Sequence, residues 1–170
     1  MAVLRKIAKA IEWFNEWIGR IFSWLIVALV MLTVMEVIMR RFLGTPTIWS
    51  FEVLNQIFGL HFMIVAAFGL KYGSHVSVDL FTHRLEAKRL AALDIFSYLL
   101  FFFPFCIVGI VQGYRFAATS WAMREHSWSV FAPPMYPIKS VILITFVLLL
   151  AQGIAEVIKK IFIIKGLKYD

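Results

Sequence analysis

The sequence predicts an all-α integral membrane protein with four transmembrane helices, an N-terminal amphipathic helix in the membrane interface, and both termini in the cytoplasm. Hydrophobic residues make up 62% of the 170 residues, and the mean hydropathy is +0.85. An average soluble domain is only about 45–50% apolar. A fold in water could not bury this much apolar surface, so the lipid bilayer is the expected solvent.

Four apolar segments are long enough to cross a bilayer, which requires about 20 mostly apolar residues. They lie at about 21–39, 53–70, 91–113 and 138–158. The connections between them are short and no internal repeat is visible, so residues 1–170 are predicted to form a single membrane domain. Pro104 interrupts the third segment, where we expect it to free the carbonyl of Leu100 and to kink the helix.

Residues 1–20 are predicted to form the amphipathic helix. Apolar residues recur every three or four positions from Leu4 to Ile21, and most charged residues fall on the other side of the helical wheel. This pattern is typical of a helix that lies in the membrane interface, with Trp13 and Trp17 near the headgroups. The alternative is a cytoplasmic extension of the first span.

The distribution of Lys and Arg predicts the orientation. Most of the 17 basic residues fall within 5–20, 71–89 and 159–168, which lie on one side of a four-span topology. Cytoplasmic loops carry such an excess, so both termini are predicted to be cytoplasmic. These basic segments also suit contact with anionic phospholipid, and no motif suggests nucleic acid as a partner.

No enzyme signature occurs in the chain. It lacks a phosphate-binding glycine loop, a GxSxG motif and an HExxH motif. A lone cysteine, Cys106, excludes an internal disulfide. We therefore expect no catalysis, no metal and no cofactor in this chain, apart from a bound phospholipid.

Ionisable residues inside a membrane are candidates for function. Glu36 lies late in the first span, four residues before Arg40, so the two side chains can pair on one helix face. The alternative is a proton-coupling carboxylate. His61 lies in the middle of the second span, where an interhelical hydrogen bond is favoured over a proton relay or a haem ligand, because the other histidines fall in loops.

Several elements of the sequence resemble the small four-helix membrane subunit, the Q subunit, of tripartite ATP-independent periplasmic (TRAP) transporters. After the first span come Arg40-Arg41 and then Trp49-Ser50-Phe51-Glu52, although many members have two adjacent acids after the tryptophan. After the second span comes His75-Val76-Ser77-Val78-Asp79, followed by a basic loop. Before the fourth span comes Pro133-Pro134-Met135-Tyr136-Pro137-Ile138-Lys139, with Gln152-Gly153 inside the span. The resemblance covers roughly residues 21–158.

The resemblance implies an accessory subunit in the bacterial inner membrane. Transporters of this family import organic acids with a sodium gradient, and a soluble periplasmic protein captures the substrate. A large membrane subunit holds the sodium and substrate sites and moves like an elevator, while the small subunit is part of the static frame. Since this sequence ends at Asp170, we expect the large subunit to be a separate chain.

The resemblance also suggests roles for particular residues. We expect Trp49 and Glu52 to stabilise the outer corner between the first two spans, with Arg40 or Arg41 as partner. We expect His75 and Asp79 to fix the inner turn. Glu36 and Lys139 complete the set of expected structural or subunit-interface residues.

Other functions remain as alternatives. A small proton-coupled multidrug exporter also has four spans, acts as a homodimer and needs a glutamate in its first helix, but Glu36 lies near the exit end of that helix. A membrane enzyme subunit that binds haem or quinone would use His61. An unrelated assembly factor is a third alternative.

Overall fold

The structure of the protein, a computed structural model, describes residues 2–72 and 86–167. It consists of helices joined by short connections. In chain order these are α1 (Ala2–Ser23), α2 (Leu25–Arg41), α3 (Ser50–Lys71), α4 (Ala87–Ser97), the π-helical turn η1 (Tyr98–Phe102), α5 (Phe103–Met123) and α6 (Tyr136–Ile164).

Four helical stretches are long and apolar enough to cross a membrane. They are Val3–Arg41, Ser50–Lys71, Ala87–Met123 and Tyr136–Ile164. Within residues 2–72 and 86–167 no strand forms, and the only β-type pairing is an isolated bridge between His126 and Pro134. The prediction of an all-α protein with four membrane-spanning helices is therefore confirmed.

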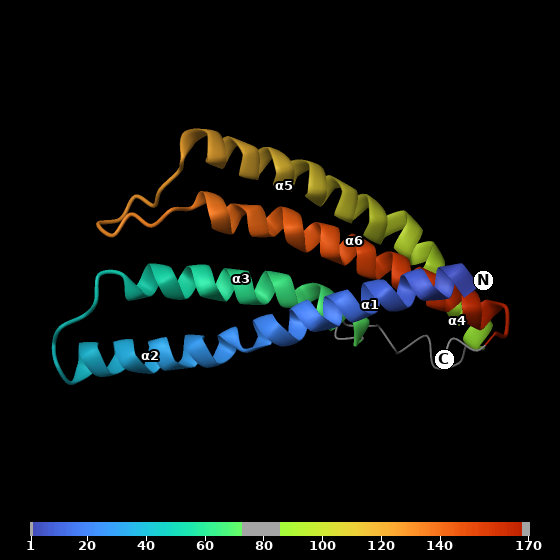
Figure 1. Cartoon of the computed structure of the whole chain (residues 1–170), viewed down its shortest axis with the longest axis horizontal. Coiled ribbons are helices and arrows are strands. Elements are labelled where there is room, and N and C mark those ends of the chain that lie inside the picture. The colour runs from blue at the N-terminus through green and yellow to red at the C-terminus, as the bar shows by residue number, and fades with distance from the viewer. Residues whose placement is uncertain (1, 73–85, 168–170) are drawn as a thin grey trace.

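The central helix is α6. It packs against α1, α3, α4 and α5, whereas α2 packs mainly against α3. Figure 1 shows α5 on one side of α6 and α3 with α2 on the other, all running roughly along the long axis of the molecule. Because α6 has neighbours on several faces, its buried residues extend from Val141 to Phe162.

The start of α1 and the end of α6 lie at the same end of the molecule, on the right in Figure 1. We name this the terminal end. The α2–α3 and α5–α6 connections lie at the opposite end, which we name the loop end. Four crossings would place the two termini on the same side of a membrane. The assignment of this side to the cytoplasm stays a prediction.

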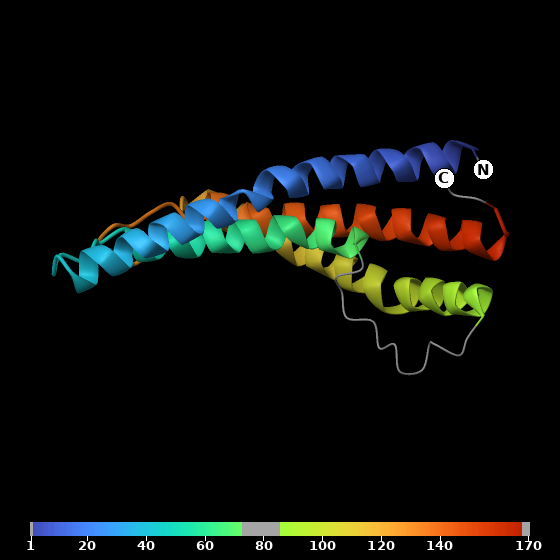
Figure 2. The same ribbon diagram turned by 90° about the horizontal axis from the view of Figure 1, so that it is seen from below.

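The first span differs from its expected form because α1 and α2 are nearly continuous. The interruption is at Trp24, whose amide donates to the carbonyl of Ile21 at 3.2 Å. Figure 2 shows α1 running alongside α6. The face of α1 turned toward its neighbours carries the buried residues Ala8, Asn15 and Gly19. That α1 lies in the membrane interface stays a prediction.

The irregularity expected at Pro104 is the π-helical turn η1. Proline has no amide hydrogen and its ring crowds the preceding turn. Immediately before it, the amide of Phe103 donates to the carbonyl of Tyr98, five residues earlier. A wider turn of this kind accommodates the missing donor. As a result, α4, η1 and α5 follow a curved path around α6 (Figure 1).

Candidate functional site

A chain of polar side chains joins α1 to α6 near the terminal end. Asn15 Nδ2 donates to Gln152 Oε1 at 2.9 Å, and Gln152 Nε2 donates to Glu156 Oε1 at 3.0 Å. Lys159 Nζ lies 2.7 Å from Glu156 Oε1 and also pairs with Glu12. Buried polar groups must be hydrogen-bonded to be tolerated. This set, which we name the polar layer, therefore holds α1 against α6 in one register.

Two further ion pairs connect the remaining spans at the same end. Lys71 of α3 pairs with Glu16 of α1. Lys160 Nζ of α6 lies 2.5 Å from Asp94 Oδ2 of α4. Together with the polar layer, these pairs tie the four spanning stretches to one another through charged groups.

His61 occupies the expected structural position in α3. Its Nδ1 lies 3.0 Å from the carbonyl oxygen of Phe22, at the end of α1. The predicted interhelical hydrogen bond is therefore present. Within the described residues, no group of three or more His, Cys, Asp or Glu side chains is placed to hold a metal ion.

At the loop end, Glu36 fastens α2 to the connection that follows it. The Glu36 carboxylate accepts from Arg40 Nη2 at 3.1 Å and from Thr47 Oγ1 at 2.5 Å. The side chain is buried, as is the neighbouring Ser50. The Glu36–Arg40 geometry is that of an ion pair within one helix, with Thr47 closing the corner between the first two spans.

Glu52 lies in the first turn of α3, next to the corner between α2 and α3, but its side chain bonds to a different segment. Its Oε1 accepts from Ser127 Oγ at 3.0 Å, so Glu52 connects α3 to the segment between α5 and α6. Neither expected basic partner takes part in that bond, because Arg40 pairs with Glu36 and Arg41 is exposed. Trp49, which precedes α3 as its N-cap, is half-buried. At the corner between α2 and α3 the Glu36 carboxylate bonds to Arg40 and Thr47, and the stabilising role expected of Trp49 and Glu52 there stays a prediction.

Residues 124–135, between α5 and α6, form a compact hairpin. The amide of Ser127 donates to the carbonyl of Pro133 at 3.0 Å, and the amide of Met135 donates to the carbonyl of Glu125 at 2.9 Å. Arg124 and Ala132 both have a positive φ angle of 45°. Arg124 ends α5 in this left-handed conformation, and Ala132 adopts the same φ within the hairpin. The hairpin is thus held in shape by its own backbone bonds.

Lys139 anchors this hairpin to α6. Its Nζ lies 2.5 Å from Glu125 Oε2 and 4.2 Å from the centre of the Phe116 ring. The ammonium is therefore engaged on one side by a carboxylate and on the other by an aromatic face. Gln56 of α3 adds a bond to the carbonyl of Pro134 at 3.3 Å.

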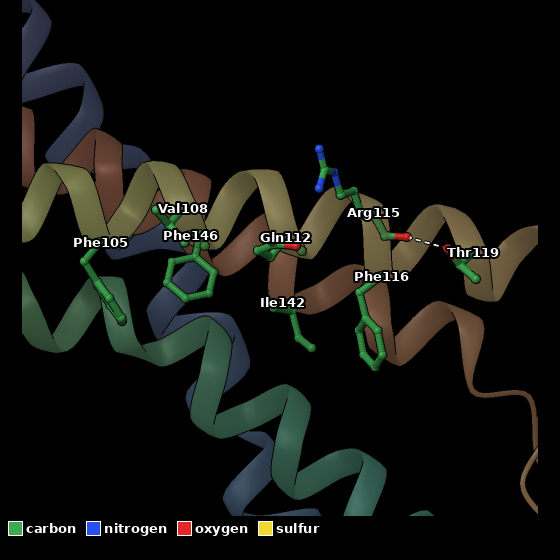
Figure 3. A pocket seen from close by; sticks show the side chains of 10 residues that line it. Phe105, Val108, Gln112, Arg115, Phe116, Thr119, Ile142 and Phe146 are labelled. Carbon is green, nitrogen blue, oxygen red and sulfur yellow. Dashed lines mark hydrogen bonds between the residues drawn. The ribbon is translucent and has the colours of Figure 1, made fainter.

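An open apolar groove of about 630 Å³ runs along the surface where α5 meets α6. A Cβ atom at Gly109 would lie 2.4 Å from the Phe146 ring, so the glycine makes room for that ring. Figure 3 shows the guanidinium of Arg115 pointing away from the rings of Phe116 and Phe146. The groove is lined by Phe105, Val108, Gly109, Gln112, Gly113, Arg115, Phe116, Thr119, Ile142 and Phe146.

Residues 29–162 match the family model described as tripartite ATP-independent periplasmic transporters, DctQ component. This stretch is well over half of the 170 residues. The chain belongs to the DctQ family. A search of curated proteins finds no match to it. The chain is therefore the small membrane component of a TRAP transporter, a multi-pass protein of the inner membrane that works with other TRAP components.

Membership in the DctQ family confirms the resemblance noted in the sequence. The family is one of transporter components and not of enzymes, and it gives no support to the multidrug-exporter alternative. His75 and Asp79, which were expected to fix the inner turn of this DctQ chain, lie outside the described residues.

Sequence reasoning missed most of the polar layer of this DctQ chain. It noted Gln152 as part of the resemblance but assigned no role to Glu12, Asn15, Glu156 or Lys159. A signal was available, because Glu12 and Asn15 share one helix face with small residues. In the fourth span, Glu156 follows Gln152 at a spacing of four and Lys159 follows Glu156 at a spacing of three. Only the packing of α1 along α6 brings the two sets together.

Proposed function

We propose that this DctQ chain is the static scaffold of a sodium-coupled TRAP importer of organic acids. It frames a large elevator-type membrane subunit carried on a separate chain, and a soluble periplasmic binding protein delivers the substrate. Sodium and substrate bind in the large subunit, and this chain carries no catalytic group. Anionic phospholipid lies against its basic terminal end, which faces the cytoplasm.

The observation that carries this proposal is the set of interhelical ion pairs at the terminal end. Lys71–Glu16, Lys159–Glu12 and Lys160–Asp94 each join two different spanning stretches. Desolvation offsets much of the attraction within such a pair, but separating its members leaves uncompensated charges, which is costly. Sliding one span past another would separate these charges in a medium of low dielectric constant. Such a bundle suits a fixed reference against which a second subunit moves.

A cross-linking experiment tests the static role. Ala8 of α1 and Ala155 of α6 are both buried in one apolar cluster with Ile158 and Phe162. In a Cys106→Ala background, Ala8→Cys with Ala155→Cys would be joined by a short bifunctional thiol reagent. The complex would then be reconstituted in liposomes, and uptake of labelled organic acids would be followed under a sodium gradient.

We expect the cross-linked complex to retain uptake within about twofold of the untreated complex, since a scaffold does not need motion between α1 and α6. The single variant Ala8→Cys, treated with the same reagent, controls for chemical modification. Loss of uptake only in the cross-linked double variant would show that the subunit must move, and would contradict the scaffold role. Uptake that is independent of sodium would contradict the coupling.

A further inference from the structure

A second cavity lies at the loop end, between the first turns of α3 and the hairpin of residues 124–135. Its volume is about 270 Å³. It is lined by Phe51, Glu52, Asn55, Gln56, Ser127, Pro133, Met135 and Ile138. Two regions far apart in the sequence therefore converge on this cavity, namely the start of α3 and the hairpin with the first turn of α6.

One oxygen of the Glu52 carboxylate accepts no hydrogen bond from the described residues. Oε1 accepts from Ser127 Oγ at 3.0 Å, which fixes the orientation of the carboxylate. Oε2 is shielded from solvent and has no hydrogen-bond donor among the described residues. A buried carboxylate oxygen without a donor is costly. Lys139, which follows the cavity residue Ile138, is committed to Glu125, and Arg40 is committed to Glu36.

The other groups around the cavity indicate which ligand fits. Gln56 uses its Nε2 on the carbonyl of Pro134, so its amide nitrogen is engaged. The remaining wall is largely apolar and includes Phe51, Pro133 and Ile138. A negative group in the wall of a largely apolar cavity matches a side chain with an aliphatic stem and a cationic head. A metal ion would need a set of ligands, and none of three or more His, Cys, Asp or Glu side chains occurs in the described part of the chain.

We propose that this cavity receives a lysine or arginine side chain of another transporter component, with the cationic head beside the Glu52 carboxylate. This inference rests on the proposed function, because the partner is a protein of the same complex. The same hairpin supports a protein partner, since Trp128 at its tip is fully exposed and Val130 is 89% exposed. A preorganised loop that presents an uncovered tryptophan beside a charged anchor is typical of an interface hot spot.

The test compares wild type with Glu52→Gln and Ser127→Ala. Glutamine keeps the oxygen that accepts from Ser127 and removes only the charge, so the hairpin anchor is preserved. The tagged chain would be expressed with its native transporter components and purified gently, and the dissociation of the other components would be followed over time. The melting temperature of the isolated subunit would be measured for each variant, in sodium and in choline salts.

We expect Glu52→Gln to speed dissociation at least about tenfold, because removing one member of a buried charge pair acts mainly on the off-rate. Its isolated melting temperature should equal or exceed that of wild type, since a partly buried carboxylate without a countercharge has been removed. Ser127→Ala, which keeps the charge, should speed dissociation less than Glu52→Gln.

Two results would overturn the assignment. Equal dissociation of Glu52→Gln and wild type would mean that no cationic side chain occupies the cavity. A melting temperature of the isolated wild type that rises with sodium, and no longer does so in Glu52→Gln, would identify a metal-ion site instead. If the wild-type chain retained no transporter component at all, the proposed function itself would fail, and that outcome is distinct from a failure of Glu52 alone.

Discussion

Single buried polar residues decide which face of α1 turns inward. Asn15 is 2% exposed and Gln152 is fully buried, whereas Trp13 and Phe14 on the same helix as Asn15 are exposed. In a lipid solvent, apolar side chains gain little by turning inward, while polar ones must find partners. The inward turn of Asn15 therefore follows from the hydrogen bonds that α6 offers to it.

A pH-dependent contribution is expected from Glu125 in the hairpin. The hydrogen bond from the Lys139 ammonium holds the pKa of the Glu125 carboxyl below its ordinary value of 4.5. A lowered pKa in the folded state stabilises the protein above the unfolded value, and this stabilisation is lost as the pH falls through the folded value. Both side chains are partly exposed, so the contribution is modest.

The comparison of wild type with Glu125→Gln measures this contribution. We expect wild type to melt at the higher temperature at neutral pH, and the difference to shrink as the pH falls from 4.5 through the lowered pKa of the folded state, below which the carboxyl is protonated in both states. Thermal unfolding in detergent across this pH range gives the result. A difference that stays constant or grows toward acid pH would contradict the assignment of the Glu125–Lys139 pair.

At the scale of helices, two helices can approach closely where one of them carries a glycine, which has no side chain. Gly19 of α1 lies against Phe68 of α3, and a Cβ atom at Gly19 would be 2.5 Å from the Cβ of Phe68. That atom is near the backbone and cannot rotate away, so any side chain at Gly19 pushes the two helices apart. Gly59, also on α3, has no atom within 4 Å of its would-be Cβ.

These two glycines form a matched pair of test sites. We expect Gly19→Ala to destabilise the subunit by about 1–3 kcal/mol, the usual cost of overpacking. Gly59→Ala should be neutral or slightly stabilising, because alanine favours helix over glycine and meets open space. Melting temperatures of the two variants in one detergent give the comparison. Equal effects would mean that α1 does not pack closely on α3.

The π-helical turn η1 shows how a proline bends a spanning helix. Pro104 removes one donor, and the turn at Tyr98–Phe102 redistributes the helical bonds just before it. Phe102 within this turn fills the space above Gly153 of α6, where a Cβ atom would lie 2.4 Å from its ring. The proline thus sets the bend, and the glycine of α6 lets the bent segment pack closely.

At the scale of the whole molecule, charged pairs hold the four spanning stretches in one arrangement. Exchanging the charges of the Glu16–Lys71 pair tests whether the pair itself matters. Glu16→Lys alone places a positive charge beside Lys71 and Arg20, so we expect reduced yield of the assembled complex. Adding Lys71→Glu should recover much of this yield, although Arg20, which pairs with Glu16 in the wild type, would remain beside a lysine.

The yield of the complex after tagged purification, together with the melting temperature of the subunit, reports the outcome. Recovery in the double variant indicates coupling between the two sites. A double variant as impaired as the sum of its single variants would show that the two residues contribute independently, and that this pair does not tie α1 to α3.

The class of the molecule can be inferred from local features of its sequence. Apolar runs of spanning length, the position of Pro104, and the motifs around Trp49 and Lys139 can be read locally, because they depend on hydropathy and on neighbours in the chain. The Glu36–Arg40 spacing is likewise a local property of one helix. These local features predict the four spanning helices and the resemblance to the family.

Which polar side chains come into contact depends on the folded arrangement of the helices. Asn15 and Gln152 are 137 positions apart, and Glu52 and Ser127 are 75 positions apart. Lipid does not select an inward face by hydrophobicity, so apolar periodicity alone cannot say how α1 rotates or which loop approaches Glu52. The rotation of α1 and the position of the loop instead depend on helix packing at small residues and on hydrogen bonds between buried polar atoms. Both involve positions that come together only in the folded chain.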